Sequence, residues 1–159
     1  MSFRTTFVSL SIMKTFNVLF LCTGNSARSI IAEALVTTIS QGKLIGYSAG
    51  SHPKGDIHPI AEALAIELNY PREKLRSKSW NEFSHPEAPK MDFIITVCDN
   101  AKGEVCPIWP GHPATIHWGL LDPALAQGAC EEQKKVFCDV RDQLKEKIQT
   151  LINFTQYTS

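Results

Sequence analysis

Residues 17–28 place an apolar run, a tight turn and the start of a helix directly after one another. The run NVLFL over 17–21 is short and continuous, which is typical of a strand buried on both faces of a parallel sheet. The run leads into Cys22, and the turn-forming residues 23–26 follow. Apolar residues at a spacing of four then predict a helix over 27–40. A strand that turns directly into a helix is the first half of a βαβ unit, so this segment predicts an α/β fold.

The remaining pattern continues this alternation of strands and helices. Apolar runs predict strands over 44–49, 93–97 and 114–118, and helices are expected over 59–68, 79–83 and 129–154. We therefore expect one domain over residues 14–159, built on a four-stranded parallel sheet with helices on both faces. Residues 1–13 are expected to form a disordered N-terminal extension. Ligands bind at the carboxyl ends of strands in such sheets, and Cys22 and Cys98 each directly follow a strand run.

Charge and cysteine content exclude several functional classes. The 159 residues carry a formal net charge of zero and no basic block, so we expect neither nucleic-acid nor membrane-surface binding. No apolar run approaches the roughly 20 residues that a membrane-spanning helix needs. Five cysteines, an odd number without an export signal, indicate reduced thiols in the cytoplasm rather than a secreted disulfide framework.

The turn after the first strand has the form Cys-x5-Arg-Ser, with Cys22, Arg28 and Ser29 as its fixed points. A loop that enters a helix N-terminus directs its N–H groups inward and forms an anion site. Arg28 can hold two oxygens of a tetrahedral anion, and Ser29 can donate a hydrogen bond to a thiolate. The oxyanion-binding residues are expected to be Thr23, Gly24, Asn25, Ser26, Ala27 and Arg28. The same groups predict a Cys22 pKa between roughly 3.5 and 7.5. The alternative is a buried thiol beside a surface arginine.

This loop resembles the phosphate-binding loop of the low-molecular-weight protein tyrosine phosphatases and of the arsenate reductases that share their fold. The resemblance extends to Ala32-Glu33-Ala34, to Ser48-Ala49-Gly50 and to Asp122-Pro123. It implies that Asp122 is the general acid, on a loop stiffened by Pro123. Asp122 could equally cap a helix that begins at Pro123, and the two roles are compatible.

Several features favour the reductases within this resemblance. Alanine and leucine follow Asp122-Pro123 where the phosphatases tend to carry aromatic residues, and His117-Trp118-Gly119 is similar to the reductase pattern. The resemblance implies that Cys98 attacks a Cys22–arsenic adduct and that Cys106 then attacks Cys98. Thioredoxin or a glutathione and glutaredoxin system would supply the electrons, with no tightly bound cofactor.

The sequence is also compatible with other functions. Hydrolysis of phosphotyrosine or of a small phosphate ester needs Cys22, Arg28 and Asp122 but neither Cys98 nor Cys106. A redox sensor or an anion-binding regulator needs no general acid. Cys98 and Cys106 could also be thiols without a role.

Parts of two kinds of metal site are present in the sequence. A zinc site from Cys98, Cys106, His112 and His117 has suitable ligand types but an unusual spacing, so no metal ligand is predicted. Some reductases of this type bind potassium near the loop, and Asn25, Glu33 and Ser48 match part of such a site.

The last predicted helix carries two further cysteines. The apolar residues Cys130, Phe137, Leu144 and Leu151 follow one another at a spacing of seven, so Cys130 is expected in the core. Cys138 is expected on the opposite side of the helix. His52, His58 and His85 are expected to be solvated.

Overall fold

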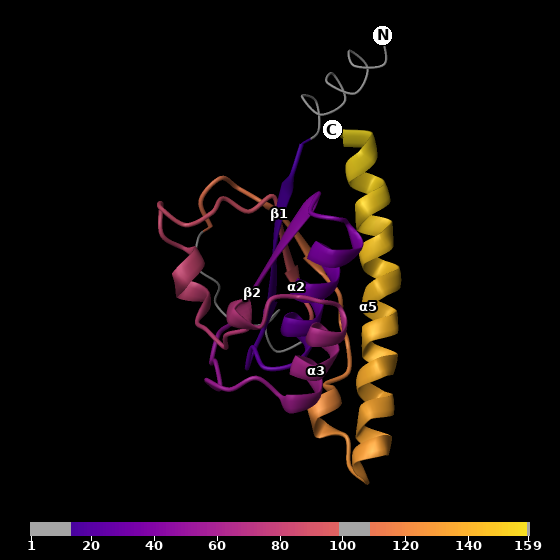
Figure 1. Ribbon diagram of the computed structural model, residues 1–159. Coiled ribbons are helices and arrows are strands. Elements are labelled where there is room, and N and C mark those ends of the chain that lie inside the picture. The colour runs from indigo at the N-terminus through magenta and orange to yellow at the C-terminus, as the bar shows by residue number, and fades with distance from the viewer. Residues whose placement is uncertain (1–13, 99–108, 159) are drawn as a thin grey trace.

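The computed structural model describes residues 14–98 and 109–158 and contains four strands and three α-helices (Figure 1). The strands all run parallel in the order β2-β1-β3-β4, as the sequence predicted. In chain order the elements are β1 (Phe16–Cys22), α2 (Arg28–Ile39), β2 (Leu44–Gly50), α3 (Pro59–Glu67), β3 (Phe93–Thr96), β4 (Ala114–His117) and α5 (Cys130–Thr158). Three short 3-10 helices are η1 (Arg72–Lys74), η2 (Trp80–Phe83) and η3 (Pro123–Leu125).

The central strand β1 is buried on both faces, which explains its unbroken apolar sequence. Val18 and Phe20 point into a core formed with α2, α3 and α5, and Leu19 and Leu21 point into a second cluster on the other face. Figure 1 shows α2 and α5 on one side of the strands. Among the described residues, the other face is covered by η2, through Trp80 and Phe83, and by Met91.

Helix α2 lies unusually close to strand β2 because Gly46 has no side chain. A Cβ atom at Gly46 would lie 2.5 Å from the carbonyl oxygen of Glu33 and 2.6 Å from a methyl carbon of Val36. This close approach holds the first βαβ unit together, and with it the loop between β1 and α2.

The long helix α5 runs beside α2 along the whole molecule (Figure 1). Its buried stripe consists of Phe137, Val140, Leu144, Ile148, Leu151 and Ile152. Cys130 was predicted to join this stripe, but it is exposed because it is the first residue of α5, where Glu131 and Glu132 are also exposed. Cys138 was predicted to face away, but it is half-buried and packs against the core beside Phe137.

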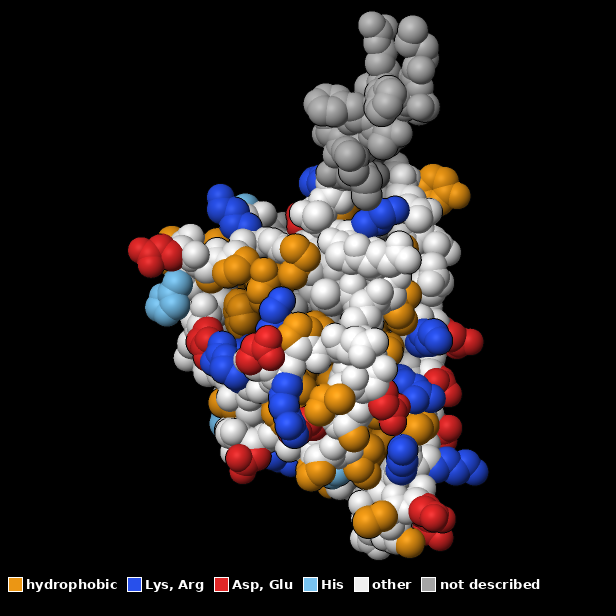
Figure 2. Space-filling view, viewed as in Figure 1, with side chains coloured by type: hydrophobic (Ala, Val, Ile, Leu, Met, Phe, Trp, Pro, Cys, Tyr) orange, Lys and Arg blue, Asp and Glu red, His pale blue; other side chains and the backbone are white. Residues whose placement is uncertain are grey.

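The visible surface carries mixed charge. Figure 2 shows Lys and Arg side chains interspersed with Asp and Glu side chains on this face, in keeping with the zero net charge. Within the described residues, no helix is both long and apolar enough to cross a membrane. The predicted N-terminal extension, residues 1–13, lies outside the described residues, as does Cys106.

Candidate active site

Cys22 ends strand β1, and its sulfur lies inside the loop that leads to α2. The backbone N–H of Asn25 donates to Cys22 Sγ at 3.1 Å, and Ser29 Oγ lies 2.9 Å from the same sulfur. Asn25 adopts a φ of 46°, in the left-handed region that asparagine tolerates better than most residues. This backbone conformation turns the N–H of Asn25 inward, so the loop curls around the thiol.

The hydrogen-bond network orients the Asn25 amide toward Ser29. Asn25 Oδ1 accepts from the backbone N–H of Lys78 at 2.8 Å, so the Asn25 amide nitrogen faces Ser29 and donates to its Oγ at 2.8 Å. A Cys22 thiolate can only accept, so in that form of the site the Ser29 hydroxyl donates its hydrogen to Cys22 Sγ. Both Asn25 and Ser29 are fully buried, which keeps water from competing for these bonds.

Cys22 is 3% exposed, and this burial changes its predicted acidity. Burial raises the pKa of the Cys22 thiol above its usual value, and the hydrogen bonds from Ser29 and Asn25 and the charge of Arg28 oppose that rise without cancelling it. The sequence led us to expect a lowered pKa, and that prediction is wrong because burial outweighs the donors. The motif reveals the donors around the sulfur but not the depth at which the strand end is buried.

Arg28 and Asp122 meet at the mouth of the loop. Arg28 donates from one nitrogen to the carbonyl oxygen of Leu120 at 2.9 Å, and a second nitrogen lies 3.5 Å from Asp122 Oδ2. Asp122 Oδ1 accepts from the backbone N–H of Ala124 at 3.0 Å, so Asp122 caps η3. The capping role considered from sequence is confirmed, and Oδ2 remains directed toward Arg28.

A pocket of about 300 Å³ lies over the loop. It is lined by the predicted oxyanion-binding residues Thr23, Gly24, Asn25, Ser26, Ala27 and Arg28, together with Cys22, His52, Lys54, Asp122 and Leu125. Ser29 lies beneath the loop rather than in the pocket wall. The structure thus brings all of the predicted oxyanion-binding residues into one pocket. Cys22 and Asp122, the predicted nucleophile and general acid, line the same pocket.

Three pocket residues, Leu125, His52 and Lys54, were not predicted from sequence. His52 and Lys54 follow β2. The segment that carries them runs along the loop, with backbone hydrogen bonds from His52 to the Thr23 carbonyl at 2.9 Å and from Lys54 to the Gly24 carbonyl at 3.0 Å. Both side chains are exposed at the pocket rim. The available signal was that they directly follow β2, the neighbour of β1 in the sheet. His58 was also expected to be solvated, but it is half-buried against Phe137.

Cys98 lies beside the loop because β3 pairs with β1. Leu21 pairs with Thr96, so the two strands end next to each other and Cys98 lies near Thr23. Thr23 Oγ1 is 3.7 Å from Cys98 Sγ, and Cys98 is 3% exposed. Cys98 also acts electrostatically on Cys22, in the direction that raises its pKa. Both thiols therefore lie at the carboxyl ends of adjacent strands, on either side of Thr23.

The proposed metal ligands do not form a cluster in the described part of the chain. No group of three His, Cys, Asp or Glu side chains lies close enough there to hold a metal ion. His117, one candidate for zinc, instead has its Nδ1 atom 2.6 Å from Thr96 Oγ1. Glu33 and Ser48, candidates for potassium, are hydrogen-bonded to each other beside the ammonium of Lys78.

Comparisons with known proteins agree with this geometry. The family described as low molecular weight phosphotyrosine protein phosphatase matches residues 17–157. An arsenate reductase of Oceanobacillus iheyensis is 37% identical over 131 residues, covering 82% of this chain and 91% of that protein. A solved arsenate reductase in an intermediate state has a TM-score of 0.68 at 28% identity, covering 89% of this chain and 99% of that one. A thioredoxin-dependent arsenate reductase of Corynebacterium glutamicum shares the fold, with a TM-score of 0.64 at 23% identity over 93% of this chain and 65% of that one.

Proposed function

The chain belongs to the low molecular weight phosphotyrosine protein phosphatase family, and we propose that it reduces arsenate to arsenite through Cys22, Cys98 and Cys106. One observation carries this proposal: the pocket nucleophile Cys22 has a second buried thiol, Cys98, beside it at the end of the neighbouring strand. Hydrolysis of a phosphate ester has no use for that second thiol. The naming of the relatives described above as arsenate reductases supports the same reading.

The first step is capture of the oxyanion by the loop. Inward-facing N–H groups at the N-terminus of α2 and the guanidinium of Arg28 suit a tetrahedral oxyanion. Arg28 is held by Leu120 and Asp122, so it is oriented before the anion arrives. Phosphate and sulfate have the same shape as arsenate, and we expect both to compete for the site.

The second step forms a bond between sulfur and arsenic. Cys22 attacks as the thiolate, which the hydroxyl of Ser29 and the N–H of Asn25 stabilise by hydrogen bonds. An arsenic–oxygen bond breaks, and Asp122, in the pocket wall, donates the proton that lets this oxygen leave as water. Arsenic is still pentavalent at this point, so no electrons have yet been transferred.

The third step supplies two electrons from thiols. The Cys98 thiolate attacks Cys22 Sγ, the sulfur–arsenic bond breaks, and its electron pair stays on arsenic. Arsenite leaves, and Cys22 and Cys98 are left joined as a disulfide. The proximity of Cys98 to Thr23 and Cys22 supports this step.

The relay then needs a thiol that can carry the disulfide outward. Cys106 attacks Cys98, which releases Cys22 as a thiolate and leaves a Cys98–Cys106 disulfide. An external dithiol, from thioredoxin or from glutathione and glutaredoxin, reduces that disulfide and completes the cycle. Such donors maintain reduced thiols in the cytoplasm, where we propose that the protein acts.

Phosphatase activity is the second candidate, because the matching family is described by it. Cys22, Arg28 and Asp122 would serve hydrolysis equally well. The lining of the pocket argues against phosphotyrosine as the main substrate: among described residues it contains Leu125 and His52 but no Phe, Tyr or Trp side chain that could pack against a phenyl ring. A sensor or regulator would have no use for an acid in the pocket wall, where Asp122 lies.

The proposal is tested by measuring arsenite release with a thioredoxin system, with a glutathione and glutaredoxin system and with neither, beside hydrolysis of an aryl phosphate. We expect many arsenite molecules per chain with at least one donor system, and at most one without a donor. Rapid aryl phosphate hydrolysis without any arsenite would favour the phosphatase reading.

A further inference from the structure

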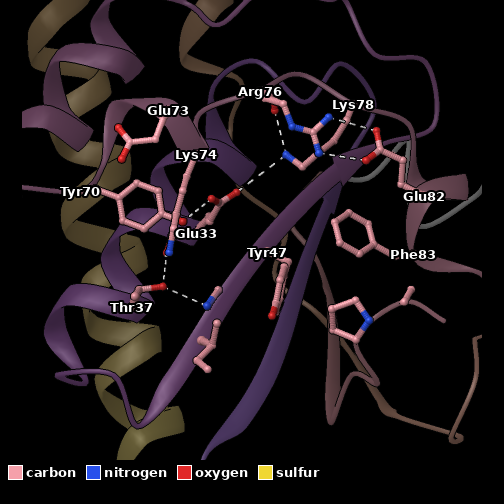
Figure 3. Close-up of a pocket in the computed structure, with 14 residues that line it drawn as sticks. Glu33, Thr37, Tyr47, Tyr70, Glu73, Lys74, Arg76, Lys78, Glu82 and Phe83 are labelled. Carbon is pink, nitrogen blue, oxygen red and sulfur yellow. Dashed lines mark hydrogen bonds and ion pairs between the residues drawn. The ribbon is translucent and has the colours of Figure 1, made fainter.

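A buried ion pair lies behind the oxyanion loop, at the base of the cavity of about 500 Å³ drawn in Figure 3. Glu33 on α2 is 3% exposed and Lys78 is 7% exposed. Figure 3 shows their charged groups facing each other, and Lys78 Nζ lies 3.9 Å from Glu33 Oε1. Burying a charge is costly unless it is paired and hydrogen-bonded, so each group depends on the other.

The ammonium of Lys78 is surrounded by oxygen atoms of three kinds. Lys78 Nζ donates to the Arg76 carbonyl oxygen at 2.8 Å and to Ser48 Oγ at 3.4 Å, in addition to the Glu33 carboxylate. Ser48 Oγ donates in turn to Glu33 Oε1 at 2.6 Å, and the Tyr70 hydroxyl donates to the other carboxylate oxygen. Carbonyl, hydroxyl and carboxylate oxygens are the ligands that hard metal cations take.

Burial and the partner's charge act in opposite directions on the pKa of each group. Burial raises the pKa of Glu33, and the charge of Lys78 opposes that rise. Burial lowers the pKa of Lys78, and the charge of Glu33 opposes that fall. Removing either charge would therefore leave the other poorly stabilised.

The backbone of Lys78 connects this cluster to the reactive sulfur. Its N–H donates to Asn25 Oδ1 at 2.8 Å, and its carbonyl oxygen accepts from Gly50 N–H at 2.9 Å. The first bond sets the orientation of the Asn25 amide, which donates to Ser29, and Ser29 contacts Cys22. The position of Lys78 therefore affects the geometry of the loop without any contact between Lys78 and the anion.

We propose that the ammonium of Lys78 is the built-in cation of this oxygen cluster, so that the oxyanion loop works without an added monovalent cation. The resemblance noted above implies potassium beside Asn25, Glu33 and Ser48, but the residues present do not fit it. A second positive charge among the same oxygens would be repelled by Lys78. Lys78 is thus a positioning residue for the anion site, and this inference deepens the proposed function.

Sulfate affinity and arsenate turnover test the proposal when both are measured in choline chloride and in potassium chloride at equal ionic strength. For the unaltered protein we expect sulfate affinity and arsenate turnover to agree within about twofold between the two salts, because potassium and the anion should not be coupled in this protein. In choline chloride, sulfate affinity and arsenate turnover of Lys78→Met should both fall on the order of 10- to 100-fold, because the loop that binds the anion is no longer held in place. Potassium should recover much of that loss by entering the vacated oxygen cluster.

Lys74→Met is the matched control. Lys74 lines the same cavity, and its replacement by Met removes the same charge, but the Lys74 side chain is exposed. We expect this variant to behave like the unaltered protein in both salts. A salt response in Lys74→Met as large as that in Lys78→Met would overturn the assignment to Lys78.

Three other results would overturn the proposal. The first is a several-fold gain in sulfate affinity when potassium is added to the unaltered protein. The second is full sulfate affinity of Lys78→Met in choline chloride. The third is a loss in Lys78→Met that potassium does not reverse, since that would reflect a purely structural role.

A double variant keeps the test decisive if Lys78→Met fails to fold. Glu33→Gln combined with Lys78→Met removes both charges, and it should bind sulfate without any response to potassium because no carboxylate remains to attract the cation. A potassium response in this double variant would contradict the proposed cluster. Because sulfate is not reduced, loss of arsenate turnover with normal sulfate binding would contradict the proposed function alone.

Discussion

The hydroxyl oxygen of Ser29 lies 2.9 Å from the sulfur of Cys22, on a side chain that is fully buried one residue after Arg28. Asn25 donates to the same hydroxyl, and Ser29 can donate its hydrogen to the sulfur when Cys22 is a thiolate. Together with the N–H of Asn25, this contact ties the sulfur that we propose as the nucleophile to the loop and to α2. It also opposes the rise in the Cys22 pKa that burial causes.

Ser29→Ala should therefore raise the pKa of Cys22 above its value in the unaltered protein. The physical reason is the loss of a hydrogen bond that favours the thiolate. The rate of alkylation of Cys22 by a neutral reagent, followed against pH, measures the shift. Ser26→Ala changes another hydroxyl of the same loop and serves as the control. Superimposable pH profiles for Ser29→Ala and the unaltered protein would show that the bond does not stabilise the thiolate.

Arg28→Lys should weaken binding of phosphate and sulfate by about 10- to 100-fold, the loss expected when a charged hydrogen bond of about 1.5–3 kcal/mol is removed. An ammonium cannot reproduce the planar fork of a guanidinium. Calorimetric titration measures the affinity directly. Arg72→Lys, at an exposed arginine paired with Glu62, is the control. Equal affinity in Arg28→Lys would contradict the assignment of Arg28 to the anion.

His58 should make the stability of the fold sensitive to mild acid. Its Nδ1 atom accepts from the backbone N–H of Ile60 and caps α3, and burial against Phe137 lowers its pKa. Lys54 lowers it further, and Asp122 opposes both. The folded state therefore favours neutral His58, so its stabilisation is complete above pH about 6.5 and is lost as the pH falls below that value.

His58→Asn keeps a capping side chain that does not titrate in this range. The difference in Tm between pH 7.5 and pH 5.5 should be smaller in His58→Asn than in the unaltered protein. His85→Asn, at an exposed loop histidine, should leave the difference unchanged. An equal or larger difference in His58→Asn would show that the cap is not the source of the pH dependence.

Gly46→Ala should destabilise the fold by about 1–3 kcal/mol, the usual cost of forcing an extra carbon into a packed interior. The added Cβ would meet the backbone of Glu33, which cannot move without shifting α2. Denaturant unfolding measures the loss as a lower midpoint with an unchanged slope. A midpoint equal to that of the unaltered protein would mean that α2 and β2 can separate freely.

The sequence predicts the fold well because its strongest signals are local. The apolar run of β1, the turn after Cys22 and the periodicity of α2 each identify one element without knowledge of its neighbours. Cys130 was misplaced because helical periodicity gives the direction of a side chain but not the point at which the neighbouring structure ends. The Cys22 pKa was misjudged for a related reason, since burial depends on the assembled core.

The parts of the site that the sequence did not reveal come from contacts between distant segments. His52 and Lys54 reach the pocket only because β2 lies beside β1. Lys78 is a single lysine in a loop, and nothing in its local sequence indicates that its ammonium is buried beside Glu33. Predicting these contacts requires the strand order and the path of residues 76–79 past Asn25.

Arsenite released per chain by Cys98→Ser, with a recycling reductant present, tests the central claim most directly. Cys98→Ser should release almost no arsenite while any weak aryl phosphate hydrolysis persists, because only reduction needs the second thiol. Cys106→Ser should release about one arsenite and stop with Cys22 and Cys98 joined, and Cys138→Ser should turn over normally. Repeated turnovers by Cys98→Ser would contradict the thiol relay.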